Sequence, residues 1–414
     1  MKIAIIGTGI AGLTVAYLLY VDHDLTIFEA NDYVGGHTHT IPVQTAHNTY
    51  AVDTGFIVFN DWTYPNFIKL LTRLEVPSQP SPMSFSVKCE RTGLEYNGTS
   101  LNTLFAQRRN LVSPSFHRML RDILRFNREA PSLLQEDTTS ITLGSYLTEN
   151  RYSQEFVEQY LIPMSASIWS TDPRQMPRVP ARFLVQFFHN HGMLSVNQRP
   201  QWRVVAKGSQ EYVKRLIHPF ANRIRLRCPV QGVTRHSTHV SVKSVGQEAE
   251  HFDHVVIATH SDQALAMLTD LSIQERAILS ALPYQTNETV LHTDNSLLPR
   301  SRRAWASWNY HRLQGEQSQV AITYNMNILQ SLNAPETFCV TLNRTAAIDP
   351  SKIIQKRIYH HPVYTEGGVA AQKQHAEING VNRTYFCGAY WGYGFHEDGV
   401  NSALAVCQYF GKSL

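Results

Sequence analysis

The 414-residue chain is poor in charge, in paired cysteines and in long apolar runs. Charged residues make up 17% and hydrophobic residues 43%, a composition that is typical of a folded globular protein and excludes a disordered one. The net charge of +4 is too small to indicate nucleic-acid binding. No stretch reaches the roughly 18 uninterrupted apolar residues of a membrane-spanning helix. A chain of this length is expected to form two domains that share a large buried surface.

The five cysteines are odd in number and include no C-x-x-C pair, which argues against a disulfide framework and fits a reducing cytoplasm. The first predicted strand begins at residue 3, so we expect no cleavable signal before it and a cytoplasmic protein. The 19 histidines form clusters at 37–39, 189–191 and 360–361, but none has a zinc spacing such as H-E-x-x-H. We therefore expect no metal site.

A strand, three glycines and a helix open the chain in the order that is typical of dinucleotide binding. Residues 3–6 predict a buried parallel strand, and a helix is predicted from about residue 10 to residue 20. Between them the G-x-G-x-x-G spacing falls on Gly7, Gly9 and Gly12. The first glycine makes a tight turn, the second lets a pyrophosphate approach the backbone, and the third lets the helix pack on the strand. The helix start, with Ile10 and Ala11, directs N–H groups at the phosphates.

A second predicted strand, residues 25–28, ends on Glu29 and is followed by Ala30. The Glu29 carboxylate is placed to accept hydrogen bonds from a ribose diol and would repel a 2′-phosphate. Downstream, the sequence reads Gly35, Gly36, His37 and Thr38. A plain NAD site does not need such a glycine pair, so the pattern indicates a more specific cofactor.

This arrangement resembles the flavin amine oxidase and phytoene desaturase superfamily, in which an E-x(5)-G-G-[RH]-x-x-T-like element follows the first βαβ unit and runs along FAD. The resemblance implies an α/β fold with a Rossmann-type, glutathione-reductase-like FAD-binding domain, an inserted α+β substrate domain, and FAD as cofactor. His37 stands where amine oxidases usually carry arginine. The permanent positive charge of that arginine is therefore missing here.

The resemblance also implies further cofactor contacts in the middle of the chain. A predicted strand at 50–60 is interrupted by one glycine, which often marks close backbone approach to a ligand. The candidates are Thr54, Gly55 and Phe56 beside the isoalloxazine ring, Val230 over the adenine, and Ala258 and Thr259 along the dinucleotide. A β-bulge at residue 55 and ordinary core packing at the later positions are the alternatives.

The C-terminal stretch 385–409 predicts a strand, an aromatic glycine-rich loop and a helix. In the superfamily's last motif, this loop meets the ribityl chain and the helix points its N-terminus at the flavin. The matching residues are Gly388, Ala389, Glu397, Asp398, Gly399 and Val400. His396 and Tyr393 are the catalytic candidates, and His396 is the expected acid or base in the loop, because histidine titrates near neutral pH. Alternatively, His396 bonds to backbone, and Glu397 and Asp398 are helix caps.

The domains are expected to alternate along the chain. The FAD-binding domain is assigned to 1–75, 200–265 and 371–414, and the substrate domain to 76–199 and 266–370. Three prolines between residues 77 and 82 predict a linker, and segments 85–87 and 93–96 predict a small antiparallel sheet. Residues 163–170 predict a loop that could line a pocket, and the alternation at 320–326 predicts a strand with one buried face.

Residues 104–131 are basic and predicted to be helical. The arginines are Arg108, Arg109, Arg118, Arg121, Arg125 and Arg128, against only Asp122 and Glu129. This pattern fits either a solvated helix face packed on the protein or a basic amphipathic surface on anionic lipid headgroups. Peripheral contact with the inner face of a membrane is therefore one of two hypotheses.

The resemblance extends over nearly the whole chain to a bacterial group of FAD-dependent oxidoreductases often found alongside cyclopropane-fatty-acid-synthase-like methyltransferases. It rests on strings such as G-G-H-T-H-T and D-T-G-F-I-V-F-N. The group implies a lipid-like, modified acyl substrate that gives a hydride to flavin N5, with a lipid methyltransferase as a possible partner. Three alternatives stay open: an amine oxidase, a double-bond isomerase and a non-catalytic partner of the methyltransferase. Amine oxidases commonly hold a water against N5 with a lysine, but none occurs between Thr259 and Pro350.

Overall fold

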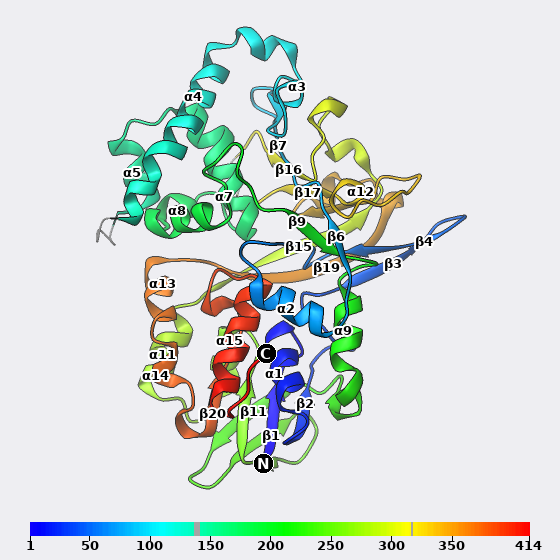
Figure 1. Cartoon of the computed structure of the whole chain (residues 1–414), viewed down its shortest axis with the longest axis vertical. Coiled ribbons are helices and arrows are strands. Elements are labelled where there is room, and N and C mark those ends of the chain that lie inside the picture. Colours follow the sequence, from blue (N-terminus) through cyan, green and yellow to red (C-terminus); the bar gives the residue numbers. More distant parts are fainter. Residues whose placement is uncertain (136–140, 316–317) are drawn as a thin grey trace.

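The computed structural model describes residues 1–135, 141–315 and 318–414. Its lower half is built around a parallel sheet and holds both chain termini, while its upper half combines a larger sheet with a group of helices (Figure 1). The described chain therefore shows the mixed α/β architecture that the sequence predicts. The domain boundaries drawn from the sequence stay a prediction.

The lower half is organised by a five-stranded parallel sheet in the order β10-β2-β1-β14-β20. Its strands are β1 Lys2–Ile6, β2 Asp24–Phe28, β10 Ile224–Arg225, β14 His254–Ile257 and β20 Thr384–Phe386. Apolar residues fill both faces of the central strands, which is typical of parallel sheets. Helices α1 (Ile10–Leu19) and α15 (His396–Gln408) pack side by side on one face. The other face packs against a three-stranded sheet, β11 Val230–Arg235, β12 Val240–Ser244 and β13 Glu250–Phe252.

The upper half contains a seven-stranded sheet in the order β19-β15-β18-β17-β16-β7-β8. Its strands are β7 Phe85–Cys89, β8 Glu95–Asn97, β15 Tyr284–His292, β16 Trp308–Arg312, β17 Ile322–Asn325, β18 Cys339–Leu342 and β19 Ile353–Pro362. One face carries Tyr310, Ile322 and Val340, which belong to the largest hydrophobic core. The opposite face carries buried polar groups such as Thr323 and Thr341, whose hydroxyl oxygens lie 2.7 Å apart. The polar face thus satisfies its own hydrogen bonds, and the apolar face is left for the core.

Helices cover the apolar face of this sheet. They are α3 Leu101–Leu104, α4 Pro114–Glu129, α5 Leu143–Glu149, α6 Gln154–Phe156, α7 Ile162–Trp169 and α8 Ala181–Asn190, with a π-helical turn, η3 Val157–Leu161, between α6 and α7. The prediction of a loop at 163–170 is wrong, because most of this segment forms α7. The hydroxyls of Ser165 and Ser167 donate to the carbonyls of Leu161 and Pro163, so these small polar residues do not interrupt the helix.

Three other local expectations fail for topological reasons. The proline-rich segment is not a free linker, because β6 (Ser78–Pro80) pairs with β9 (Trp202–Val205), which also pairs with β5 (Val58–Asn60). Proline is tolerated there because β6 is an edge strand. Strands β7 and β8 extend the seven-stranded sheet instead of forming their own, since β7 pairs in parallel with β16. Strand β17 is buried on both faces instead of one.

The remaining elements connect these layers. They are α2 Pro65–Arg73, α9 Gln210–Ile217, α10 Ser261–Met267, α11 Ile273–Ser280, α12 Met326–Leu329, α13 Glu366–Gln372, α14 His375–Ile378, β3 Thr40–Gln44 and β4 Thr49–Asp53. In the described ranges, no helix combines the length and apolar character that crossing a bilayer requires.

Candidate cofactor and substrate site

The turn between β1 and α1 accepts only glycine at two of its three glycine positions. Gly7 has a φ of +105°, and a Cβ atom there would lie 2.7 Å from the Ala258 carbonyl oxygen. A Cβ on Gly12 would lie 2.1 Å from the Gly7 carbonyl oxygen, so α1 packs directly on the turn. A Cβ on Gly9, by contrast, would meet no described atom within 4 Å. The second glycine therefore borders free space where a pyrophosphate can approach the backbone.

Glu29 is a buried, fixed carboxylate at the end of β2, beside this turn. One carboxylate oxygen accepts hydrogen bonds from the N–H and the hydroxyl of Thr8. The other accepts from the backbone N–H of Asn31 at 2.9 Å and from its side-chain amide at 2.8 Å. The neighbouring Ala30 is exposed. The carboxylate is therefore held in one orientation before any ribose arrives, which lowers the ordering cost of binding.

The second glycine pair lies on the first turn. Gly35 donates its N–H to the Thr8 carbonyl at 3.1 Å, and a Cβ on Gly36 would lie 3.1 Å from the Gly9 Cα. Gly35 and Gly36 have φ values of +127° and +59°, in the region that favours glycine. The two glycine motifs therefore form one backbone surface, although more than twenty residues separate them in the sequence.

His37 lies in a cluster of neutral aromatic rings instead of carrying a permanent charge. Its ring centroid is 5.7 Å from that of His260, 5.6 Å from His361 and 5.1 Å from Tyr359. Burial lowers the pKa of His37 and of His361 to about 3 and the pKa of His260 to about 4. The described residues include no group of His, Cys, Asp or Glu that could hold a metal ion.

The segment around Gly55 is packed against His37. A Cβ on Gly55 would lie 2.1 Å from the His37 carbonyl oxygen, which also accepts the Phe56 N–H at 2.8 Å. The Thr54 hydroxyl oxygen lies 2.8 Å from that of Tyr359. Glycine is therefore required at residue 55 by the close approach of two backbone segments, and the predicted approach of a ligand to this backbone stays a prediction.

His396 is the first residue of α15 and not a loop residue as the sequence predicted. Its ring stacks on Phe56, with centroids 3.3 Å apart, and its Nε2 lies 3.0 Å from the Thr38 hydroxyl and 2.9 Å from the Tyr212 hydroxyl. Burial holds the pKa of His396 well below its usual value of 6.5. The imidazole is therefore neutral and bonded to side-chain hydroxyls, and its role as acid or base stays a prediction.

The two carboxylates that follow His396 serve as helix caps. Glu397 accepts hydrogen bonds from the backbone N–H groups of Asn66 (3.1 Å) and Phe67 (2.8 Å) at the start of α2. Asp398 accepts from the Phe395 N–H at 2.9 Å, and burial raises its pKa to about 6. These bonds account for both side chains without a cofactor, and their place in the cofactor set stays a prediction.

The other cofactor candidates lie around the same turn. A Cβ on Gly399 would lie 2.6 Å from Ile10 Cγ2 and 3.9 Å from the Ala389 Cβ, and Gly388 donates its N–H to the Ser402 hydroxyl at 2.9 Å. Val400 is buried in the core that α1 and α15 share, and Ala258 and Thr259 lie against Gly7. Val230 begins β11, two residues after Cys228, whose N–H donates to the Glu29 carbonyl at 2.8 Å. Residues from several separate segments of the chain therefore lie near this turn, and their contacts with a cofactor stay a prediction.

An aromatic wall joins the C-terminal loop to helices α7 and α8. We define it as Trp169, Phe183, Phe187, Tyr364 and Tyr393. Within it, the Tyr393 ring lies 4.8 Å from Phe183 and 5.4 Å from Phe187, and the Tyr364 ring lies 5.1 Å from Phe183. The Trp169 indole donates to the Tyr393 carbonyl at 3.1 Å. The wall thus fixes the loop that holds Tyr393 against the upper half of the molecule.

One polar atom in the aromatic wall has no partner. The buried Tyr364 hydroxyl forms no hydrogen bond within the described ranges, and it would lie 2.6 Å from a Cβ on Gly394. Burial keeps the pKa of Tyr364 well above 10, so the hydroxyl stays a neutral donor. An unpaired buried hydroxyl is costly, which makes it a candidate contact for a bound molecule.

Sequence reasoning missed four residues of this site. Asp53 accepts hydrogen bonds from the Ser209 N–H and hydroxyl and from the Gln330 amide, and burial raises its pKa to about 6. Tyr212, Tyr359 and His361 complete the contacts of Thr38, Thr54 and His37. Asp53 is adjacent to the predicted Thr54, and His361 belongs to the histidine cluster at 360–361, so the local sequence gave a weak indication of both site residues. The local sequence gave no indication of Tyr212 or Tyr359.

The parallel sheet, the glycine turn, the fixed acid and the free space at Gly9 together define a dinucleotide-binding site, which fits FAD. Residues 10–296 match the family described as "Flavin containing amine oxidoreductase". The chain belongs to this family, and it is an FAD-dependent oxidoreductase. No curated protein matches the sequence.

Solved structures share this fold at low sequence identity. Cyclohexylamine oxidase from Brevibacterium oxydans IH-35A matches with a TM-score of 0.70 at 17% identity, covering 99% of each chain. A putative protoporphyrinogen oxidase from Exiguobacterium sp. 255-15 matches at 0.69 and 16%, covering 99% of this chain and 98% of its own. A CLA-producing fatty acid isomerase from P. acnes matches at 0.69 and 15%, with the same coverage. These likenesses establish the fold and not the substrate.

Proposed function

We propose that the protein removes a hydride from a C–H bond of a lipid-like, modified fatty acyl substrate. Bound FAD supplies the hydride acceptor, at flavin N5. The observation that carries the proposal is the aromatic wall, which belongs to the same hydrophobic core as the apolar side of the seven-stranded sheet. An acyl chain gains free energy when it leaves water for such surroundings, at roughly 25 cal/mol per Å² of apolar surface.

The residues of the chain have three tasks in this reaction. The Trp169–Tyr393 hydrogen bond holds the C-terminal loop against α7 and so fixes the aromatic surface on which a substrate would be positioned. The unpaired Tyr364 hydroxyl can donate to an oxygen of the substrate and fix its position. His396 can exchange a proton through Thr38 or Tyr212, because its Nε2 lies within hydrogen-bond distance of both hydroxyls.

Amine oxidation is the second candidate, and the same wall provides its support. Aromatic faces can hold a cationic ammonium group. In the wall, the centroid of the Phe183 ring lies 4.8 Å from that of Tyr393 and 5.1 Å from that of Tyr364. The fold accommodates both chemistries, since the names of its relatives include a cyclohexylamine oxidase and a fatty acid isomerase. The absence of lysine between Thr259 and Pro350 favours the acyl substrate.

Anaerobic mixing of the yellow holoprotein with candidate substrates tests the proposal. Cyclopropane, methyl-branched or unsaturated acyl phospholipids should bleach the flavin absorbance, and primary amines or polyamines should not. Rapid bleaching by an amine with inert lipids would establish the amine oxidase instead. Shifted double bonds without bleaching would indicate an isomerase, and a flavin inert to every class would favour a non-catalytic partner of a lipid methyltransferase.

A further inference from the structure

The end of the upper half farthest from the parallel sheet is formed by segments that are distant in sequence. We call it the tip and define it as α3, the 3₁₀ helix η1 (Arg108–Val112), the first two turns of α4 and the 3₁₀ helix η7 (Arg302–Ala304). Helix α3 contacts η7 directly, so residues near 100 and near 300 share one surface. In Figure 1 the α3–α4 segment lies at the extreme top of the molecule.

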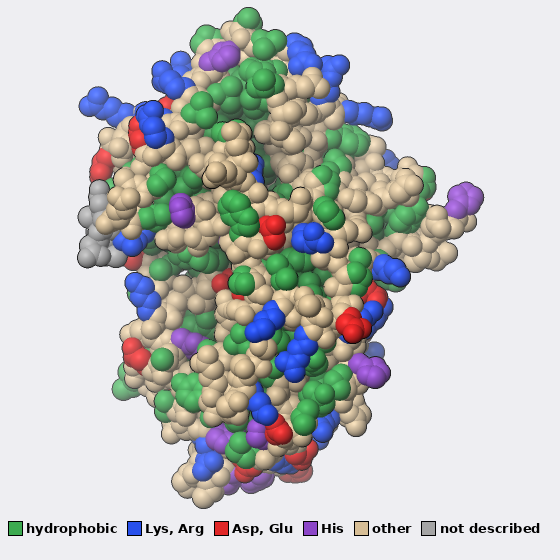
Figure 2. Space-filling model, in the orientation of Figure 1, with side chains coloured by type: hydrophobic (Ala, Val, Ile, Leu, Met, Phe, Trp, Pro, Cys, Tyr) green, Lys and Arg blue, Asp and Glu red, His purple; other side chains and the backbone are tan. Residues whose placement is uncertain are grey.

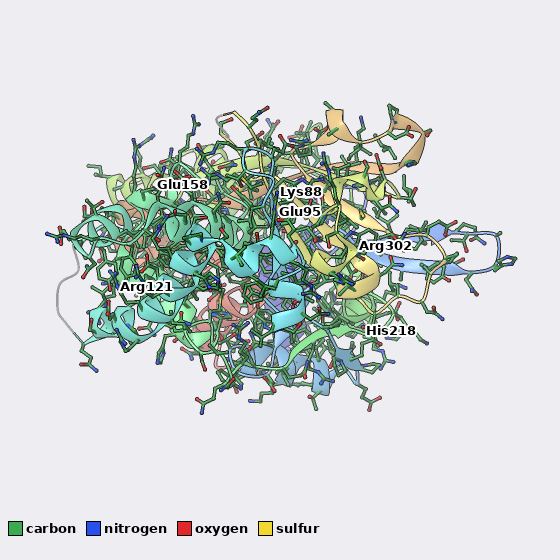
Figure 3. The ribbon with its side chains drawn as sticks, turned by 90° about the horizontal axis from the view of Figure 1, so that it is seen from above. Lys88, Glu95, Arg121, Glu158, His218 and Arg302 are labelled. Atoms are coloured by element: carbon green, nitrogen blue, oxygen red, sulfur yellow. The ribbon has the colours of Figure 1, made fainter. Side chains whose placement is uncertain are left out.

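The tip is free of acidic residues. Segments 97–121 and 295–313 contain no Asp or Glu. Their eight arginines are Arg108, Arg109, Arg118, Arg121, Arg300, Arg302, Arg303 and Arg312, of which Arg118 and Arg312 pair with Glu155 and Glu158 outside these segments. Figure 3, which looks down on the tip, shows Arg121 over the helical side and Arg302 over the side that carries η7. In a chain whose net charge is only +4, this local excess of positive charge makes the tip electrostatically distinct.

Large aliphatic side chains are exposed among these arginines. Leu101 is 75% exposed, Leu111 51% and Val112 83%. Figure 2 shows hydrophobic side chains at the top of the molecule with Lys or Arg side chains on both sides of them. Such a surface is complementary to a phospholipid bilayer. The aliphatic side chains fit the boundary of the acyl chains, and the surrounding arginines fit the headgroup phosphates.

We propose that the tip docks on the surface of an anionic phospholipid bilayer. Leu101 and Val112 enter the boundary of the acyl chains, while Arg108, Arg109, Arg302 and Arg303 bind headgroup phosphates. This proposal goes beyond the acyl substrate, because it concerns where the protein sits and rests on the tip alone. A nucleic acid would satisfy the arginines, but the exposed aliphatic side chains would gain nothing from a phosphate backbone.

The proposed surface differs from the arginine-rich face of α4. Arg118 pairs with Glu155, and Arg125 pairs with Glu129 at 3.1 Å. The guanidinium of Arg125 also lies 4.0 Å from the centre of the Tyr152 ring. These arginines serve the protein's own packing, which leaves Arg108, Arg109, Arg302 and Arg303 as the lipid-facing group.

Sedimentation of the FAD-loaded protein with vesicles tests the proposal. The probes are vesicles of phosphatidylcholine alone and vesicles of phosphatidylcholine and phosphatidylglycerol in equal parts. We expect binding only to the second kind, and weaker binding as salt is raised, because screening shortens the reach of surface charges. The variant R108E/R109E/R302E/R303E should lose binding by at least tenfold, and L101S/V112S should lose it without changing the salt dependence.

A matched variant controls for the change in total charge. Lys69, Lys243, Arg276 and Lys373 are exposed and lie outside the tip, so reversing all four to Glu alters net charge equally. This control should bind anionic vesicles nearly as well as the wild type. Equal binding by the tip variant and the wild type, or equal losses in tip variant and control, would overturn the proposal. Tip-dependent binding of RNA with no vesicle binding would overturn it as well.

Discussion

The glycine turn and the aromatic wall are each held together by a different kind of contact. Around Gly7, Gly12 and Gly55, the atoms that exclude a side chain are backbone carbonyl oxygens. In the wall, ring centroids lie about 5 Å apart and side chains meet side chains. Backbone contacts admit one residue type, whereas apolar side chains can repack. The sequence therefore predicts the cofactor well, whereas it predicts the substrate much less well.

The largest effect is expected where a side chain would fill the cofactor's space without disturbing the protein. Gly9→Ala meets no described atom, so the FAD-free protein should fold normally, yet its FAD affinity should fall at least tenfold, or about 1.4 kcal/mol. Titration of FAD followed by flavin fluorescence measures this. Gly367→Ala also meets open space, in α13, and is the control that should change neither quantity. Unchanged FAD affinity in Gly9→Ala would place the pyrophosphate elsewhere.

Removal of the fixed acid should have the next largest effect. Glu29→Ala deletes the predicted ribose acceptor, and each charge-assisted hydrogen bond is worth roughly 1.5–3 kcal/mol. It also frees Thr8 and Asn31, so thermal unfolding of the FAD-free protein should be measured beside FAD affinity. Asp32→Ala, which removes a nearby exposed carboxylate, should leave both almost unchanged. Flavin occupancy equal to wild type at low protein concentration would contradict the role of Glu29.

Acid should destabilise the FAD-free protein through its buried histidines. Burial lowers the pKa of His37, His260, His292, His311 and His361 to about 3 or 4, below the unfolded value of 6.5. The unfolded chain therefore binds more protons between these values, so stability is complete above about pH 6.5 and falls as the pH falls toward 4. Asp53 and Asp398, whose pKa values are raised to about 6, have the opposite effect, because the folded protein binds their protons more tightly. These two carboxyl groups are outnumbered by the five histidines.

The midpoint of thermal unfolding should therefore be lower near pH 5 than near pH 7. Each such imidazole contributes a slope of up to about 1.4 kcal/mol per pH unit. Replacing His292 and His311 by Asn, on the sheet face away from the aromatic wall, should flatten the profile even if it lowers stability at neutral pH. A midpoint that rises on acidification would show that the two carboxyl groups dominate.

The smallest effect is expected in the wall itself. Tyr364→Phe removes an unpaired hydroxyl and no packing, so stability should stay the same or rise slightly. If the hydroxyl contacts an oxygen of the substrate, KM for the reducing substrate should rise severalfold with little change in the limiting rate of flavin reduction. Tyr17→Phe, on the outer side of α1, is the control. An unchanged KM would show that Tyr364 faces no polar atom of the substrate.

The local sequence predicted the cofactor half well for a physical reason. Strands β1 and β2, helix α1, the glycine turn and Glu29 are formed by residues within thirty positions of one another, and their roles follow from backbone geometry. The capping box that joins Ser272 to Glu275 is local in the same way, because its two partners are three residues apart. The seven-stranded sheet was not predicted as one unit, because its parallel pair joins β7 with β16, more than two hundred residues later.

The sequence by itself determined that the chain binds a dinucleotide, because the geometry of the turn and the acid is encoded in consecutive residues. Only the tertiary structure decided what surrounds His37, that Glu397 caps α2, and that His396 stacks on Phe56. The tertiary structure alone brought together, at the tip, two segments that contain no Asp or Glu. These features depend on packing between segments hundreds of residues apart, and no local pattern specifies which distant side chains will meet.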